Sequence, residues 1–141
     1  MRADEVRDAI VTSVEDTEVD AKASALDVFK YLEPGMREVA MARDRVFTVD
    51  IVAAPLRAQR IFVNDLYECT WSLMIFYTDV PGVQDRINAD VERVSQKLNA
   101  LARDNLDIQM IQIGPADVSL TDGQIIANIS LITTYRLTAG V

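Results

Sequence analysis

Residues 83–103 read VQDRINADVERVSQKLNALAR, and they give the clearest secondary-structure signal in the chain. Its apolar residues recur at spacings of four, four, three, four and three, which predicts one continuous apolar stripe along a helix. The stripe consists of Val83, Ile87, Val91, Val94, Leu98 and Leu101. At about 1.5 Å per residue such a helix is roughly 30 Å long, enough to cross a four-stranded sheet.

Two strands are predicted before this helix. Arg45–Val52 alternates between apolar and more polar residues, as a half-buried strand does, and 53–55 (Ala-Ala-Pro) are expected to end it. Tyr67–Thr78 is rich in aromatic and β-favouring residues, and its second face becomes apolar at Met74 and Phe76. We therefore expect that end of the strand to be covered on both sides, by this chain or by a partner.

Two more strands are predicted after the helix, at Asp107–Ile113 and Gln124–Leu137. Gly114-Pro115 and Thr121-Asp122-Gly123 are expected to be turns between them. The last strand is long, so we expect it to protrude beyond its neighbours or to contact another chain. Its second face carries Ile132 among polar residues.

The remaining elements complete an α+β fold in a single domain, residues 1–141. Residues 4–15 place Val6, Ile10 and Val14 four apart, which predicts a short amphipathic helix. Residues 16–44 are expected to be mostly irregular, with one short element near Asp27–Leu32. Residues 45–138 then form a β-β-α-β-β core: a mostly antiparallel four-stranded sheet with the long helix across one face. The other face, only partly apolar, can meet water or a neighbouring subunit.

Composition argues against an enzyme. The chain has no histidine and one cysteine, which removes Ser-His and Cys-His nucleophile pairs, cysteine zinc sites and the commonest metal ligand. Its five glycines form no phosphate-binding loop. We predict no catalytic residues, no cofactor and no metal.

The net charge of −8 disfavours tight binding to DNA or RNA, because an acidic surface repels phosphates. No apolar stretch reaches the roughly 20 residues of a membrane-spanning helix, so no membrane partner is expected. The first residues are acidic and lack the apolar region of a secretion signal, which predicts synthesis in the cytoplasm.

Several residues have both a chemical and a structural interpretation. Asp85 and Asp90 could be paired carboxylates, but with Arg86 and Arg93 nearby we expect surface ion pairs. Cys69 is expected in the core, because it shares a strand face with Trp71 and Leu73 and no histidine is present to activate it.

Trp71 is expected to anchor the core, with an interface hot spot as the alternative. The long connection Leu56–Leu66 mixes basic and apolar side chains, as docking arms do, although such a loop can also simply tuck its apolar residues inward. The mixed patch in this connection consists of Arg57, Arg60, Ile61, Phe62 and Val63.

The order of these elements resembles tail terminator proteins of long-tailed bacteriophages. The resemblance is carried by residues 67–73 (YECTWSL), 77–82 (YTDVPG) and 85–90 (DRINAD), and by the closing strand Asn128–Leu137. It covers about residues 45–137, and its motifs are patterns without a catalytic signature.

The resemblance implies a structural virion protein located in the tail and neck. Six copies would form a ring that ends the tail tube and joins it to the head–neck connector protein, with DNA passing through the lumen without specific binding. The partners would be further copies of the chain, the tail tube protein and the connector, and the ring would assemble in the host cytoplasm. The loop 53–66 would contact neighbours along the tube axis, and a related head-closure or connector role is left open.

The predicted interface residues combine the mixed patch with the apolar residues of the second sheet face: Arg57, Arg60, Ile61, Phe62, Val63, Met74, Phe76 and Ile132. Two other classes of function stay open at this point. One is a small ligand-binding or regulatory ferredoxin-like domain, which predicts a closed apolar pocket between helix and sheet. The other is a histidine-free enzyme dependent on Asp85 or Asp90.

Overall fold

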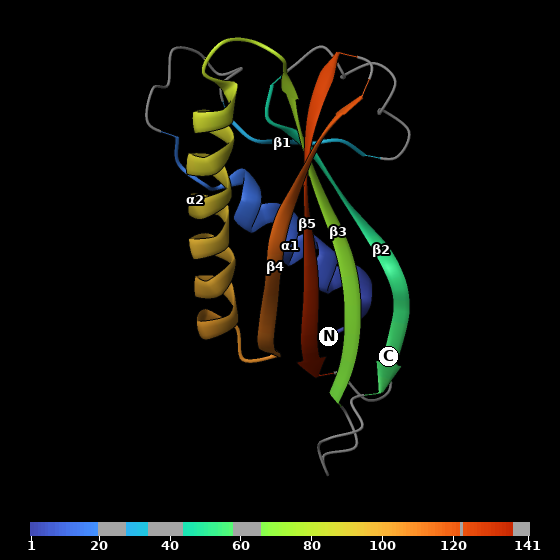
Figure 1. Ribbon diagram of the computed structural model, residues 1–141. Coiled ribbons are helices and arrows are strands. Elements are labelled where there is room, and N and C mark those ends of the chain that lie inside the picture. Colours follow the sequence, from blue (N-terminus) through green and yellow to red (C-terminus); the bar gives the residue numbers. More distant parts are fainter. Residues whose placement is uncertain (20–27, 34–43, 58–65, 122, 137–141) are drawn as a thin grey trace.

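A computed structural model of the chain describes residues 1–19, 28–33, 44–57, 66–121 and 123–136 (Figure 1). Two helices and five strands follow one another along these residues. They are α1 (Ala3–Glu15), β1 (Lys30–Tyr31), β2 (Val46–Arg57), β3 (Leu66–Thr78), α2 (Val83–Asp104), β4 (Ile108–Thr121) and β5 (Gln124–Arg136). The strands form one sheet in the order β1-β2-β3-β5-β4.

The predicted α+β class is confirmed, and the sheet differs from the prediction in one strand. Its four long strands pair antiparallel, whereas the two-residue β1 pairs parallel with the start of β2. β1 falls inside the short element expected near Asp27–Leu32. Two residues carry too little periodicity to be identified as a strand from sequence.

Both helices pack on one face of the sheet, where the core lies. In Figure 1, α1 crosses behind the sheet and α2 stands on its β4 side. Alternate residues of the central strands point toward the helices, and Val6, Ile10 and Val14 of α1 join them in one buried cluster, as their spacing predicts. The largest side chain of this core is Trp71, which is fully buried.

β2 extends further than predicted. It continues through Ala53 and Pro55 to Arg57, with register shifts against β3 between Ile51 and Ala53 and between Ala53 and Leu56. The prediction that 53–55 end the strand is therefore wrong. A proline is tolerated in a strand at a sheet edge or a bulge, and this part of β2 has both properties.

β4 is also longer than predicted, because Gly114-Pro115 is a register shift within the strand and not a turn. A Cβ on Gly114 would approach the backbone oxygen of Ser130 to 3.3 Å, so the glycine permits close contact between β4 and β5. At the far end of β4, Gly123 has a φ of 77° and leads into β5, as the predicted turn requires.

The expected protrusion of the last strand is not observed. β5 pairs with β3 from Gln124 to Arg136, and with β4 from Gln124 to Tyr135. Its neighbours are as long as β5, since β4 continues through its bulge. β5 is therefore a central strand with a partner on each side over nearly its whole length.

Candidate functional site

The sheet face opposite the helices has no helix over it in the described part of the chain. Its centre consists of three neighbouring pairs of β3 and β5 residues, here called the open face: Thr70 and Ile132, Ser72 and Ser130, and Met74 and Asn128. The Ser72 hydroxyl donates a hydrogen bond to Asn128 Oδ1 at 2.8 Å. Ser130 is exposed and the other five residues are half-buried. The open face is thus a neutral surface that mixes polar and apolar side chains.

Acidic residues lie around the open face. By strand alternation, Asp50 of β2, Glu68 of β3 and Asp117 of β4 share it. Two bases lie on the same side, Arg136 at the end of β5 and Lys30 of β1, whose register partner is Val46. The acids outnumber the bases, so this face does not attract a polyanion.

Three of the predicted interface residues lie on this side of the sheet. Met74 and Ile132 belong to the open face and are half-buried. Phe76 is only 8% exposed, because it packs in a small cluster with Leu32 and Val46. The cover predicted at this end of β3 is thus supplied at Phe76 by the chain itself.

The other predicted interface residues come from the connection after β2. Arg57 ends β2 and pairs through its backbone with Tyr67. Residues 60–63, which comprise Arg60, Ile61, Phe62 and Val63, lie outside the described residues.

The two edges of the sheet are the second surface feature. β1 pairs only with Val46 and Phe47, so from Thr48 onward β2 has no outer strand neighbour among the described residues. β4 occupies the opposite edge. Large apolar side chains are exposed along both edge strands: Ile51 and Val52 on β2, and Met110, Val118 and Leu120 on β4.

A buried ionic cluster lies between α2 and the sheet. The carboxylate of Asp90 is fully buried and accepts two hydrogen bonds from the Arg45 guanidinium, from Nε at 2.8 Å and from Nη2 at 3.2 Å. The Tyr77 hydroxyl donates a third at 2.8 Å, and Arg93 Nη1 lies 3.7 Å from the other carboxylate oxygen. We call Arg45, Tyr77 and Asp90 the buried clamp.

The prediction of a solvated Asp90 is wrong. Asp90 lies three residues after Ile87 and four before Val94, so it occupies the inner face of α2, whereas the predicted stripe residue Val91 is only half-buried. This spacing of three and four residues from buried positions could have indicated that Asp90 is buried. Its charge argued against burial, because a charged residue is rarely buried. Asp85 is exposed, as predicted.

The backbone of Arg45 explains how its guanidinium reaches Asp90. Arg45 has a φ of 61°, and its N–H donates to Phe76 O at 2.9 Å while its carbonyl accepts from Lys30 N at 3.0 Å. These two bonds hold the residue between β3 and β1 in a conformation that side chains rarely adopt. The guanidinium also lies over the ring of Phe29, 5.8 Å from its centroid.

The clamp is built for stability and not for acid–base chemistry. Burial, the Asp90 charge and the hydrogen bond to Asp90 all raise the pKa of the Tyr77 hydroxyl far above its ordinary value. Tyr77 therefore stays protonated and donates to Asp90. A carboxylate with three donors and no exposure has no room for a substrate, so its role is to join α2 to the sheet.

The remaining sequence candidates are core residues. Cys69 is 1% exposed, and burial raises the pKa of its thiol, which lowers its reactivity. Trp71 donates its indole N–H to Thr133 Oγ1 at 2.9 Å inside the core. Both predicted core positions are confirmed.

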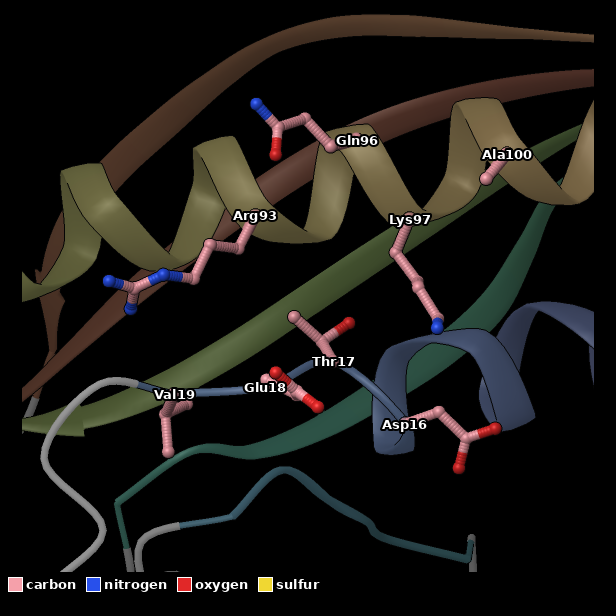
Figure 2. A pocket seen from close by; sticks show the side chains of 8 residues that line it. All are labelled: Asp16, Thr17, Glu18, Val19, Arg93, Gln96, Lys97 and Ala100. Carbon is pink, nitrogen blue, oxygen red and sulfur yellow. The ribbon is translucent and has the colours of Figure 1, made fainter.

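A hollow of about 550 Å³ lies between α2 and the segment that follows α1 (Figure 2). Arg93 and Lys97 extend from α2 toward this segment, whereas Gln96 points away from it. The complete lining is Asp16, Thr17, Glu18, Val19, Arg93, Gln96, Lys97 and Ala100. It contains acids from the segment after α1 and bases from α2, so it differs from the closed apolar pocket that a ligand-binding domain predicts.

Two kinds of feature are absent from the described residues. No group of three or more carboxylate or cysteine side chains there could hold a metal ion. No helix in that part of the chain is both long enough and apolar enough to cross a membrane.

The sequence matches no protein-family model, and no curated protein shows significant similarity to it.

Proposed function

We propose that this chain is a structural virion protein, a tail terminator that forms a six-membered ring in the tail and neck of a bacteriophage. The ring ends the tail tube and joins it to the head–neck connector, after assembly in the host cytoplasm. It binds no cofactor and catalyses no reaction.

The observation that carries this proposal is the open face together with the two sheet edges, which beyond the short β1 have no outer strand neighbour among the described residues. A protein that acts on a small molecule concentrates its polar groups in a concave site. Here the buried clamp pairs the ionic groups that point into the core, and the hollow beside α2 is lined mainly by polar and charged side chains. The other accessible features are a sheet face and two edge strands. Exposed strand edges of this kind suit contacts between proteins.

The tail and neck location rests on the sequence resemblance, and the charge distribution supports it. DNA must pass the ring without adhering to it. The net charge of −8 disfavours contact with phosphates, and the three acids around the open face outnumber the two bases there.

The proposal is tested by the size and shape of the purified protein. We expect six-membered rings in negative-stain images and in native mass spectra, and we expect rings to cap one end of purified tail tubes. The Asp85→Ala variant is a suitable control for sample handling, because Asp85 is exposed on α2.

Two results would refute the proposal. Single chains at high protein concentration would exclude the ring. A ring that ignores tail tubes but binds isolated connectors would place the protein at head closure and not at the tail end.

A further inference from the structure

The directions of the strands limit how two copies can meet edge to edge. β2, β3, β5 and β4 alternate in direction, because each of the three neighbouring pairs is antiparallel. β2 and β4 therefore run in opposite directions at opposite edges of one sheet. When a rotation about an axis parallel to the strands relates two copies, β2 of one copy meets β4 of the next in antiparallel orientation.

The sequences of both edge strands are unusual for edges left in water. Residues 51–56 of β2 and 108–116 of β4 contain no charged side chain. Natural edge strands commonly carry lysines or other charges that discourage pairing with another chain. Exposed apolar residues stand there instead, with Ile51 48%, Val52 64% and Met110 46% exposed.

Prolines and bulges restrict where a further strand can pair. Pro55 lies within β2 and Pro115 within β4, each beside a register shift, and proline offers no backbone N–H. Residues 51–54 on β2 and 108–113 on β4 contain neither proline nor charge. Residues 118–121 of β4 also lack both, but Val118 is level with Phe47, where β1 already pairs with β2.

These two stretches lie at the same level of the sheet. Ala53 pairs with Thr70, Thr70 pairs with Ile132, and Ile132 pairs with Gln112. Ala53 and Gln112 therefore share one row and one face of the sheet, at opposite edges. A rotation without a shift along the axis brings Ala53 of one copy beside Gln112 of the next.

We propose that copies of this chain join head to tail by strand addition, residues 51–54 of β2 in one copy pairing antiparallel with residues 108–113 of β4 in the next. Each copy uses one edge of each kind, so the contact repeats around a ring, and both stretches are paired in every copy when the ring closes. Antiparallel addition also satisfies backbone groups that no described strand satisfies within one copy. This inference rests on the proposed function, since it describes how copies of the ring are held together.

Disulfide trapping between variants with one introduced cysteine each tests the contact. Neighbouring strands lie about 4.8 Å apart, a spacing at which cysteines on one face can form a disulfide. The variants are Ala53→Cys and Gln112→Cys. Met110→Cys replaces Gln112→Cys as the partner of Ala53→Cys if the two strands are shifted by two residues relative to each other. The native Cys69 is buried and serves as the unreactive reference in wild-type protein.

Under oxidising conditions, we expect no covalent product from wild-type protein or from either variant alone. Mixing Ala53→Cys with Gln112→Cys or Met110→Cys should give a covalent dimer on a non-reducing denaturing gel. The double variant Ala53→Cys/Gln112→Cys, or its Met110→Cys equivalent, should give a ladder that ends at the ring size.

The outcomes separate this inference from the proposed function. Cross-linking of Gln112→Cys with itself would overturn the inference, because it requires β4 to pair with β4. Rings that yield no product in either mixture would overturn strand addition while leaving the ring in place. Single chains, in contrast, would overturn both.

Discussion

The buried clamp shows how a few residues determine the position of α2. Asp90 is fully buried and Arg45 nearly so. Water therefore cannot replace either partner of this ion pair. The desolvation of such a pair is offset only while every donor and acceptor stays matched. The clamp is therefore sensitive to the loss of one member.

We expect Asp90→Ala to lower the free energy of unfolding by about 3–5 kcal/mol, because it removes the carboxylate that pairs with the buried Arg45 guanidinium. Asp85→Ala, on the exposed side of the same helix, should change it by less than about 0.5 kcal/mol. Urea unfolding followed by the fluorescence of Trp71 measures both. Equal effects of the two substitutions would show that Asp90 is not held as described.

Tyr77 makes the folded protein less stable at alkaline pH. Its pKa in the folded state is raised, whereas in the unfolded chain the hydroxyl titrates near its ordinary value of about 10. Above that pH the unfolded state loses a proton that the folded state keeps, so stability falls as pH rises, by about 1.4 kcal/mol per pH unit for each such proton. Tyr135 adds to this loss up to pH 12, since burial raises its pKa to about 12.

We expect Tyr77→Phe to reduce the slope of stability against pH above about pH 10. At neutral pH the same variant should lose about 1.5–3 kcal/mol, because Asp90 loses one hydrogen-bond donor. Denaturant midpoints measured across the alkaline range test both effects. An unchanged alkaline slope would mean that Tyr77 ionises equally in the folded and unfolded states.

At the scale of the elements, the β4–β5 hairpin depends on one glycine. Gly123 has a φ of 77° and nothing lies within 4 Å of the Cβ position, so a substitution there changes the backbone energy alone. Alanine in the left-handed region costs about 1–2 kcal/mol, whereas asparagine visits that region more readily.

We therefore expect Gly123→Ala to destabilise the protein by about 1–2 kcal/mol and Gly123→Asn to destabilise it by less. Thermal unfolding followed by circular dichroism compares the two variants. The reverse order would indicate that φ at this position is not positive.

The bulges of β2 and β4 allow both edge strands to continue past residues that usually end a strand. Pro55 and Gly114-Pro115 would each end a strand in the interior of a sheet. At an edge they only shift the register, so both edge strands continue past them and match the length of the central pair.

At the scale of the whole molecule, charge is the property that DNA would encounter. We expect no binding to duplex DNA at physiological ionic strength, because a protein of net charge −8 releases few counterions from DNA. Fluorescence anisotropy of a labelled duplex, titrated with assembled protein, makes this measurement. Binding that weakens steeply with added salt would contradict the proposed passage of DNA through the ring.

The amino-acid sequence by itself determined the class and most elements of this protein. The apolar stripe of α2, the alternation in β3 and the apolar row of α1 are local periodicities, and a helix or strand that must bury one face displays them in its own residues. The core positions of Cys69 and Trp71 followed from the same alternation.

The burial of Asp90 and the course of the edge strands depend on tertiary contacts that the local periodicity does not contain. Asp90 is charged, and only the approach of Arg45 and Tyr77 from other elements makes its burial favourable, so no local pattern could place it inside. Strand partners likewise decided that Pro55 and Gly114-Pro115 lie in strands and that β5 is central, because whether a residue interrupts a strand depends on which neighbour needs its backbone hydrogen bond.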